Sequence, residues 1–389
     1  MMRGPMLRIA AATAASLTGL LVAGLIPAQA AAAPGWRVSQ TVGPKSGVTG
    51  PQPGGDGLPY SSFVATSRHD AWSLWNTCTP PQCSGKRAML LEHWNGTTWS
   101  QRRPASLQKL SAPVALGASS ASDVWIIGSR LTNNADLHWN GHAWSKHAVP
   151  SWVVRGDQAG DQVVSAAVFG SADVWVFSMS ARSQAQLAGR YNGHRWVKVH
   201  LPAIPLSVSA VSRSDIWALG ISPSAPGQRK LMHWNGRSWS SRTVRAGKLP
   251  AGSELSVSGV SATGPGGAWM LAEISNGTTS SHYLLHWNGT TWRRLSVPAS
   301  ATSPGDLAPD GHGGWWLLGT VVSGTATRLY FFHRSSPGHW TRDSAPLPAG
   351  AKPGTLAGLV HVPGTSSMLA AGQVQDGAAE LGVLWRYRS

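Results

Sequence analysis

Histidine recurs in this 389-residue sequence in a way that first suggests a metal site. One histidine stands at a similar place in each of several related stretches, at His93, His138, His233, His286 and His333. Imidazole is a common ligand of zinc, but each ligand atom must lie about 2 Å from the ion. Equivalent positions in neighbouring packed sheets lie on the order of 10 Å apart. We therefore predict that these histidines are framework residues, and we expect neither a metal nor a cofactor.

Aspartate recurs in a second motif, just before an apolar run that contains tryptophan, at Asp70, Asp123, Asp173 and Asp215. The chain has only 16 acidic residues, so this repetition leaves few carboxylates for acid–base chemistry. Short polar side chains often accept hydrogen bonds from backbone N–H groups in turns. We predict that these four aspartates hold the turn before the apolar strand.

Cys78 and Cys83 are the two cysteines of the chain and are separated by four residues. A redox pair favours two intervening residues, and a metal site needs more ligands than two thiols. In an exported protein, two nearby cysteines favour a disulfide that staples a loop. We predict a Cys78–Cys83 disulfide.

The first thirty residues are typical of a secretory signal peptide. Arg3 and Arg8 form a basic start, an apolar stretch follows, and Ala28-Gln29-Ala30 provides a small-x-small exit. The alternative is a membrane anchor, but the many small residues favour cleavage after Ala30 or Ala33. We expect residues 1–30 to be removed, the product to be secreted, and no membrane span to remain.

Two motifs repeat along the remaining chain at intervals of roughly 50 residues, a period typical of propeller repeats. One is an aromatic-Asn-Gly-x-x-Trp hairpin, as in Trp94 to Trp99 and Trp234 to Trp239. Asn-Gly between apolar runs predicts a tight type I′ turn. The other motif is the buried strand around Trp72, Trp125, Trp175, Trp217, Trp269, Trp316 and, in the last copy, Met368. With one further strand before each, residues 31–389 form seven four-stranded antiparallel units.

The seventh unit stops at Leu384 to Tyr387, where its outer hairpin should turn. The missing strand is available at the other end of the chain, because Trp36 to Ser39 resembles the second half of a hairpin. Pairing it with Gly382 to Tyr387 would close a ring and hide two strand edges. We predict an all-β, seven-bladed propeller whose last blade is closed by the N-terminal strand.

The blade motif resembles kelch and galactose-oxidase-like propellers, and the resemblance covers Gly35 to Ser389. It departs from the family pattern in having one glycine after the second strand, as at Gly128, and a shorter outer turn. The oxidase chemistry of that family needs a tyrosine cross-linked to cysteine, and the five tyrosines here do not offer that arrangement. The Gly- and Ala-rich composition is typical of a secreted actinobacterial-type protein.

The net charge of +16, from 32 basic and 16 acidic residues, indicates acidic partners. Positive and aromatic residues gather in the loops between strands two and three and between blades, which share one face. We predict ligand contacts there. The residues concerned are Trp75, Arg130, Trp152, Arg155, Arg182 and Arg229. The alternative is solvated charge that keeps a chain with 21 tryptophans soluble.

These observations favour a secreted, non-catalytic binding or scaffold module. Its expected partner is an anionic cell-envelope polymer, a polysaccharide or a protein, with no specific nucleic acid. The rival hypothesis is a polysaccharide lyase or hydrolase with a sparse site at the channel mouth. We expect a monomer.

Overall fold

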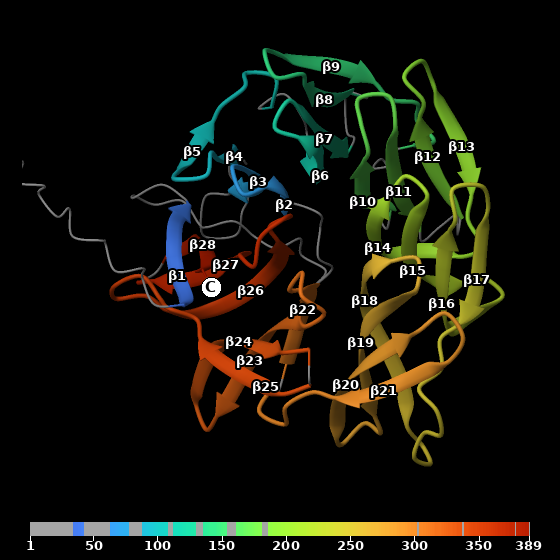
Figure 1. Cartoon of the computed structure of the whole chain (residues 1–389), viewed down its shortest axis with the longest axis vertical. Coiled ribbons are helices and arrows are strands. Elements are labelled where there is room, and N and C mark those ends of the chain that lie inside the picture. Colours follow the sequence, from blue (N-terminus) through green and yellow to red (C-terminus); the bar gives the residue numbers. More distant parts are fainter. Residues whose placement is uncertain are drawn as a thin grey trace, which may run out of the picture. The chain divides into compact units, whose positions relative to one another are not determined.

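Seven antiparallel sheets of four strands each stand around a ring, like the blades of a propeller (Figure 1). The computed structural model describes residues 34–42, 63–77, 88–107, 112–129, 135–153, 161–180, 186–301, 303–336, 338–377 and 379–388. All of them belong to one compact unit, Pro34–Ser389. The predicted signal peptide and the Cys78–Cys83 disulfide lie outside the described residues. No helix long and apolar enough to cross a bilayer occurs within these ranges.

Each blade, lettered A to G in chain order, runs from the channel outwards. The inner strands are β2 (Phe63–Ser67), β6 (Ala112–Ser120), β10 (Asp161–Val168), β14 (Ile204–Ser212), β18 (Glu254–Gly264), β22 (Ser303–Pro309) and β26 (Lys352–His361). The second strands are β3 (Asp70–Thr77), β7 (Asp123–Ser129), β11 (Val174–Ser180), β15 (Asp215–Ser222), β19 (Gly267–Ser275), β23 (Trp315–Ser323) and β27 (Met368–Asp376). The third strands are β4 (Ala88–Trp94), β8 (Ala135–Trp139), β12 (Leu187–Tyr191), β16 (Ala225–Trp234), β20 (Ser280–Trp287), β24 (Ala326–Arg334) and β28 (Ala379–Arg388). The outer strands are β5 (Trp99–Arg102), β9 (Trp144–Ala148), β13 (Trp196–His200), β17 (Trp239–Thr243), β21 (Trp292–Ser296), β25 (Trp340–Ser344) and β1 (Gly35–Val42).

The outer hairpin turns through the predicted Asn-Gly pair, but its connection has four residues instead of the two of a type I′ turn. Trp94 pairs with Trp99, and the Asn95 side-chain oxygen accepts the backbone N–H groups of Thr97 and Thr98 at 3.0 and 2.9 Å. The glycine takes a positive φ, 89° at Gly236. A Cβ there would lie 2.8 Å from Ser214 Cβ, because the hairpin packs on the turn between strands one and two. We call the end of the ring that carries both kinds of turn the turn face.

The N-terminal strand completes the last blade, as predicted. β1 pairs with β28 in antiparallel register, with Trp36 opposite Tyr387 and Gly35 opposite Arg388. Trp36 is 7% exposed and stacks on Phe331 of blade F at a ring-centroid distance of 3.7 Å. The closing strand therefore also holds two blades together.

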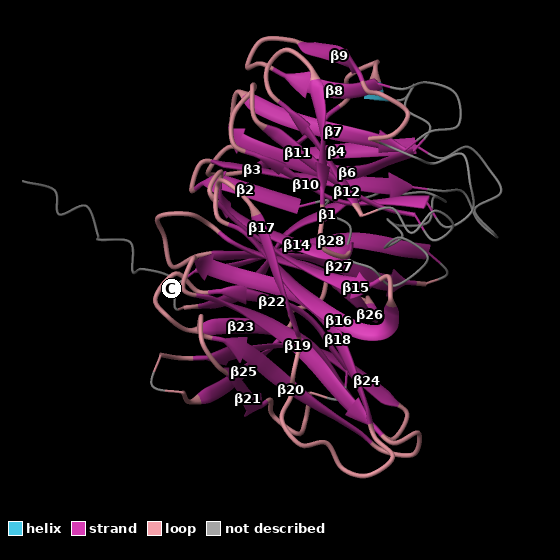
Figure 2. Cartoon of the chain, turned by 90° about the vertical axis from the view of Figure 1, so that its right-hand side faces the viewer, coloured by secondary structure: helices cyan, strands magenta, loops and turns pink. Residues whose placement is uncertain are grey.

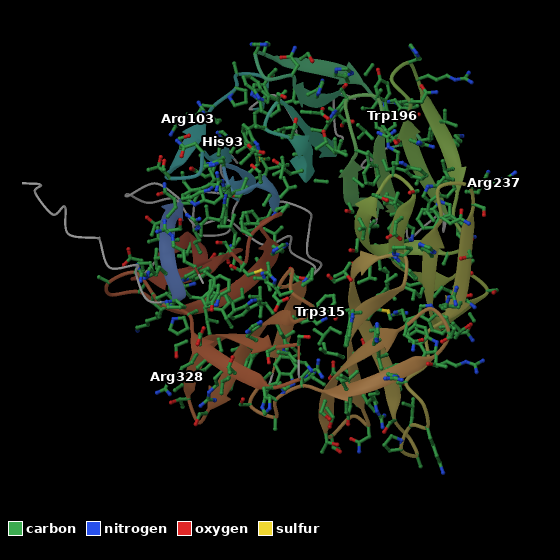
Figure 3. All side chains as sticks on the ribbon, viewed as in Figure 1. His93, Arg103, Trp196, Arg237, Trp315 and Arg328 are labelled. Atoms are coloured by element: carbon green, nitrogen blue, oxygen red, sulfur yellow. The ribbon has the colours of Figure 1, made fainter. Side chains whose placement is uncertain are left out.

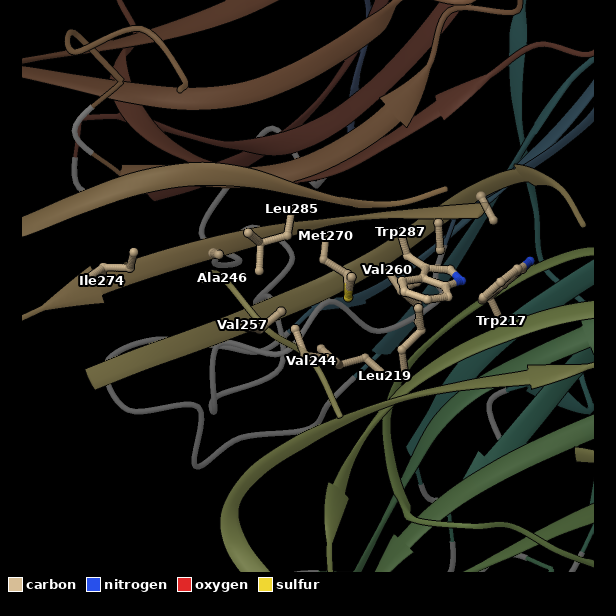
Figure 4. Close-up of a cluster of buried hydrophobic side chains, with 14 residues drawn as sticks. Trp217, Leu219, Val244, Ala246, Val257, Val260, Met270, Ile274, Leu285 and Trp287 are labelled. Atoms are coloured by element: carbon tan, nitrogen blue, oxygen red, sulfur yellow. The ribbon is translucent and has the colours of Figure 1, made fainter. Parts of the chain in front are cut away.

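Hydrophobic cores lie between blades, where side chains from two sheets meet. One cluster joins Leu219 and Leu231 of blade D to Met270, Leu285 and Trp287 of blade E (Figure 4). The second strands are buried on both faces, as their apolar runs predict. Their tryptophans are among the largest fully buried side chains, with Trp125 and Trp175 at 0% exposure. The side view shows the sheets stacked along the ring (Figure 2).

Blade G departs from the predicted alignment by one residue. Met368 pairs with Tyr387 in the way that Ala71 pairs with Trp94, so Leu369 takes the place of the recurring tryptophan. A leucine there lacks the indole, and its cross-strand partner is Arg386.

At the interface between blades G and A, two positions differ in size from those of other blades. A large side chain replaces glycine on the second strand, and a smaller one replaces a large apolar residue on the third strand. In blades D and F the second strand has Gly220 and Gly319, and a Cβ on either would lie 2.8 Å from Met232 or Phe332 on the third strand. In blade A the glycine position is Trp75, and Glu92 takes the place of the large apolar residue. The indole fills the space and donates to the Ser73 hydroxyl.

The closing strand generates a stability prediction. Trp36→Ala removes an indole that stacks on a neighbouring blade, so we expect a loss of about 3–5 kcal/mol in unfolding free energy. Urea unfolding measures the loss. The control Val197→Ala changes an exposed residue of an outer strand and should stay within about 0.5 kcal/mol. Equal losses in both variants would contradict a closing role for Trp36.

The buried Glu92 carboxyl generates a second prediction. Burial raises the pKa of Glu92 from 4.5 to about 7, although Gln101 and Arg103 oppose the shift. The folded state therefore binds a proton that the unfolded state releases, and the stability from this group is lost as the pH rises through about 7. Glu92→Leu, the residue at the equivalent position in blades B and E, should raise stability by about 2 kcal/mol at pH 8.5 relative to its effect at pH 5. A pH-independent effect in thermal unfolding would refute this account.

Candidate functional site

The recurring aspartates and histidines form one unit with the recurring tryptophan. In blade B, Asp123 accepts the indole N–H of Trp125 at 3.1 Å and lies 2.8 Å from His138 Nε2. The two rings stack at 4.4 Å. Burial alone would raise the pKa of Asp123, but hydrogen bonds from His138, Ser119 and Trp125 outweigh it and hold the pKa below its usual value. The predicted acceptance of backbone N–H groups is therefore wrong here, because the carboxylate turns inward to side-chain donors.

Blades A and D repeat the pairing, with His93 and His233 at 2.9 and 2.8 Å from their aspartates. Blade C keeps Asp173 and replaces histidine with Arg190, which donates twice, at 2.8 and 3.1 Å.

Blade F lacks the aspartate at the expected place, and Asp310 from the preceding loop replaces it. Its carboxylate lies 2.9 Å from His333 Nε2 and also accepts the backbone N–H groups of His312 and Gly314. In blade E no carboxylate takes this role, and burial together with Arg293 lowers the pKa of His286.

This arrangement confirms the framework interpretation of the histidines, since each faces its own blade's partners. Within the described ranges no group of three or more histidine, cysteine or acidic side chains lies close enough to hold a metal ion.

Three of the six predicted ligand-binding residues are described, and they lie in different places, namely Trp75 on β3, Trp152 after β9 and Arg229 on β16. Arg130, Arg155 and Arg182 lie outside the described residues. Trp75 is 6% exposed within the interface of blades G and A, so it offers no exposed aromatic plane. Trp152 is half-buried between blades B and C, with Lys198 Nζ 5.1 Å from its ring. Arg229 is half-buried on blade D and donates to the Pro226 carbonyl.

The sequence suggested long loops between strands two and three, but these loops are not long in every blade. In blades D, E, F and G these strands extend and meet in short turns. Arg229, Lys230 and Arg328 therefore lie on strands instead of loops. Glycine and serine at the tips allow the close turn, as at Gly324 with φ 61°.

Basic side chains instead gather on the outer strands. Counted from the tryptophan that begins the strand, the third residue is an exposed lysine or arginine in four blades, namely Lys146, Lys198, Arg294 and Arg342. Blades A, D and G carry Arg102, Arg242 and Arg37 on the same strand. We call this set the basic rim. Its tryptophans lie half-buried at the strand start in blades B to F.

The rim is basic because Asp343, half-buried on β25, is the one acidic residue on the outer strands that the structure describes. Seven carboxyl side chains are buried: Asp70, Glu92, Asp123, Asp136, Asp173, Asp215 and Asp310. Among the described side chains, the exposed carboxylates are Glu254 and Asp376 alone. Arg328 and Arg237 lie at the outside of the ring, and Trp315 lies inside (Figure 3). Most of the described lysine and arginine side chains are exposed, so the positive charge of this part of the chain faces solvent.

Sequence reasoning missed the rim although its signal is present. Trp-x-Lys or Trp-x-Arg follows the Asn-Gly turn in Trp144 to Lys146, Trp196 to Lys198 and Trp292 to Arg294. The hairpins are nearly uniform in sequence, which makes these residues resemble framework positions, whereas the loops differ from blade to blade.

Comparisons with known proteins support the fold. No protein-family model and no curated protein matches the sequence. Among solved structures, the polysaccharide lyase Uly1 has a TM-score of 0.51 and 8% identity, over 87% of this chain and 92% of that one. The WD40 domain of Toxoplasma gondii coronin has a TM-score of 0.46 and 8% identity, covering 90% and 87%. The SapL1 lectin, solved with alpha methyl fucoside, has a TM-score of 0.43 and 13% identity, covering 75% and 99%. The seven four-stranded sheets themselves make the chain a seven-bladed β-propeller.

The aspartate framework predicts a large stability effect. Asp123→Ala leaves His138 and the Trp125 indole without their acceptor, so we expect a loss of about 2–4 kcal/mol in thermal unfolding at neutral pH. The pKa of Asp123 is lowered in the folded state, so its contribution is full above about pH 4 and is lost as the pH falls further. The variant and the wild type should therefore converge in acid. Asp376→Ala, which removes an exposed carboxylate, serves as the control and should change little; a similar loss there would refute the framework role.

Proposed function

We propose that this propeller is an exported, non-catalytic binding module for an anionic extracellular polymer, with an acidic polysaccharide as the partner. The observation that carries the proposal is the separation of charge, with carboxylates inside the blades and cations on the basic rim. Such a surface attracts polyanions over distances near the Debye length.

The chemistry of the rim suits a polysaccharide. Guanidinium groups bind carboxylates and sulfates with two parallel hydrogen bonds. Half-buried tryptophans beside them offer apolar surface against which a sugar ring can pack. Repetition of the rim around the blades suits a ligand with repeating charges, because several weak contacts then add.

The remaining parts of the proposal come from the sequence. Export rests on the composition of residues 1–30. The relation to kelch and galactose-oxidase-like propellers, and to secreted actinobacterial proteins, rests on the blade motif and the composition.

Binding to polygalacturonate and to neutral dextran tests the proposed function. We expect the purified protein to bind polygalacturonate and not dextran, and the affinity to fall by about tenfold or more between about 0.05 and 0.5 M salt, because salt screens exposed charges. Equal binding to dextran, or affinity indifferent to salt, would contradict the proposal. Shortening of the polygalacturonate chain during incubation would favour the lyase or hydrolase hypothesis instead.

A further inference from the structure

In blade F, two arginines, Arg328 and Arg342, lie on either side of the buried Tyr330 in the sequence of strands β24 and β25. Tyr330, on β24, is 8% exposed. The Arg342 guanidinium of the neighbouring strand β25 lies over its ring, with Cζ 5.1 Å from the centroid. Arg328, two residues earlier on β24, lies on the same side of that strand. Arg328, with help from Ser344 and the charge of Arg342, lowers the pKa of the Tyr330 phenol.

Both guanidiniums reach solvent and lack an acidic partner. Arg328 and Arg342 are exposed, and none of the ion pairs among the described residues includes either one. The nearest carboxylate in sequence, Asp343, acts on Tyr387 of blade G, whose pKa it helps to raise. Two like charges are thus held beside one ring with no neutralising group.

Blades E and D show that the fold does not require this pair. In blade E, Arg294 lies over Tyr283 at 4.8 Å, which repeats the stacking, but Ser281 stands where blade F has Arg328. In blade D the phenol is replaced by Lys230, which donates to Thr243, and Gln228 stands in the Arg328 position. Of these three blades, E and F share the stacking of arginine on a phenol, whereas the second guanidinium occurs in blade F alone.

We propose that Arg328, Arg342 and the Tyr330 hydroxyl form an oxyanion subsite for the carboxylate or sulfate group of an acidic polysaccharide. The inference rests on the proposed function and names where on the basic rim the polymer is held. The Arg342 guanidinium lies over the Tyr330 ring and Arg328 stands on the same side of β24, so both can direct N–H donors at one anion.

Charge-matched variants test the subsite. Arg328→Gln with Arg342→Gln should weaken binding of polygalacturonate by about thirtyfold, because two charge-assisted contacts are lost. The control Arg195→Gln with Arg237→Gln removes the same charge from hairpins of the turn face and should weaken binding by about threefold or less, since only general attraction falls. Dextran sulfate in place of polygalacturonate shows whether sulfate or carboxylate is preferred.

A spectroscopic readout separates a bound oxyanion from diffuse attraction. An anion seated between the guanidiniums neutralises the charges that favour phenolate, so polygalacturonate should reduce tyrosinate absorbance at a fixed alkaline pH. Tyr330→Phe keeps the ring under Arg342 and should abolish that change. Arg328→Gln alone alters an exposed residue and provides a folded variant if the double substitution unfolds.

The outcomes are distinct. Equal losses in the two double variants, or an unchanged tyrosinate signal, would overturn the subsite while leaving polymer binding by the rim intact. Failure of the wild-type protein to bind either polyanion would overturn the proposed function itself.

Discussion

Each blade buries its second strand against both neighbours, and this packing is the constraint on which the rest of the structure depends. The clusters that contain Trp217, Trp316 and Trp385 each draw side chains from two sheets. A single blade would expose both faces of such a strand, so its hydrophobic burial is realised only in the ring. Closure by β1 is therefore a condition for the whole fold.

The same packing decides where charge can go. Carboxylates at the start of the second strands are held under the turn face by histidine, arginine and tryptophan, which removes them from the surface. Outer strands are the free edges of the sheets, and lysine or arginine on an edge strand opposes pairing with another chain. The basic rim thus has a structural use on every blade. A binding role needs a feature beyond the basic rim itself, such as Arg328 beside the rim residue Arg342 in blade F.

Sequence reasoning predicted the number of blades, the closing strand and the inward tryptophans, because these depend on local motifs that repeat. It could not predict the partner of Asp123, since the register that brings His138 opposite Trp125 depends on pairing between strands. The role of Asp310 could not be predicted either, because its carboxylate contacts His333 from a different position in the chain than the aspartates of the other blades. The burial of Trp75 depends on the neighbouring blade, which lacks any sequence signal. Arg229 looked like a loop residue because nothing local showed that β15 and β16 continue past their outer strand.

Pairing of Gly35 with Arg388 also sets an order of events in time. The first strand of the propeller to leave the ribosome finds its partner only when the last strand has been made. Until then blade G has an open edge and Trp36 has no stacking partner, so six blades must wait as an incomplete arc. Joining segments so far apart in the chain carries a loop-closure cost that is met at the last step, which makes such contacts slow to form. Protection against proteases and against pairing with other chains therefore arrives only when the last strand of the propeller, β28, pairs with β1.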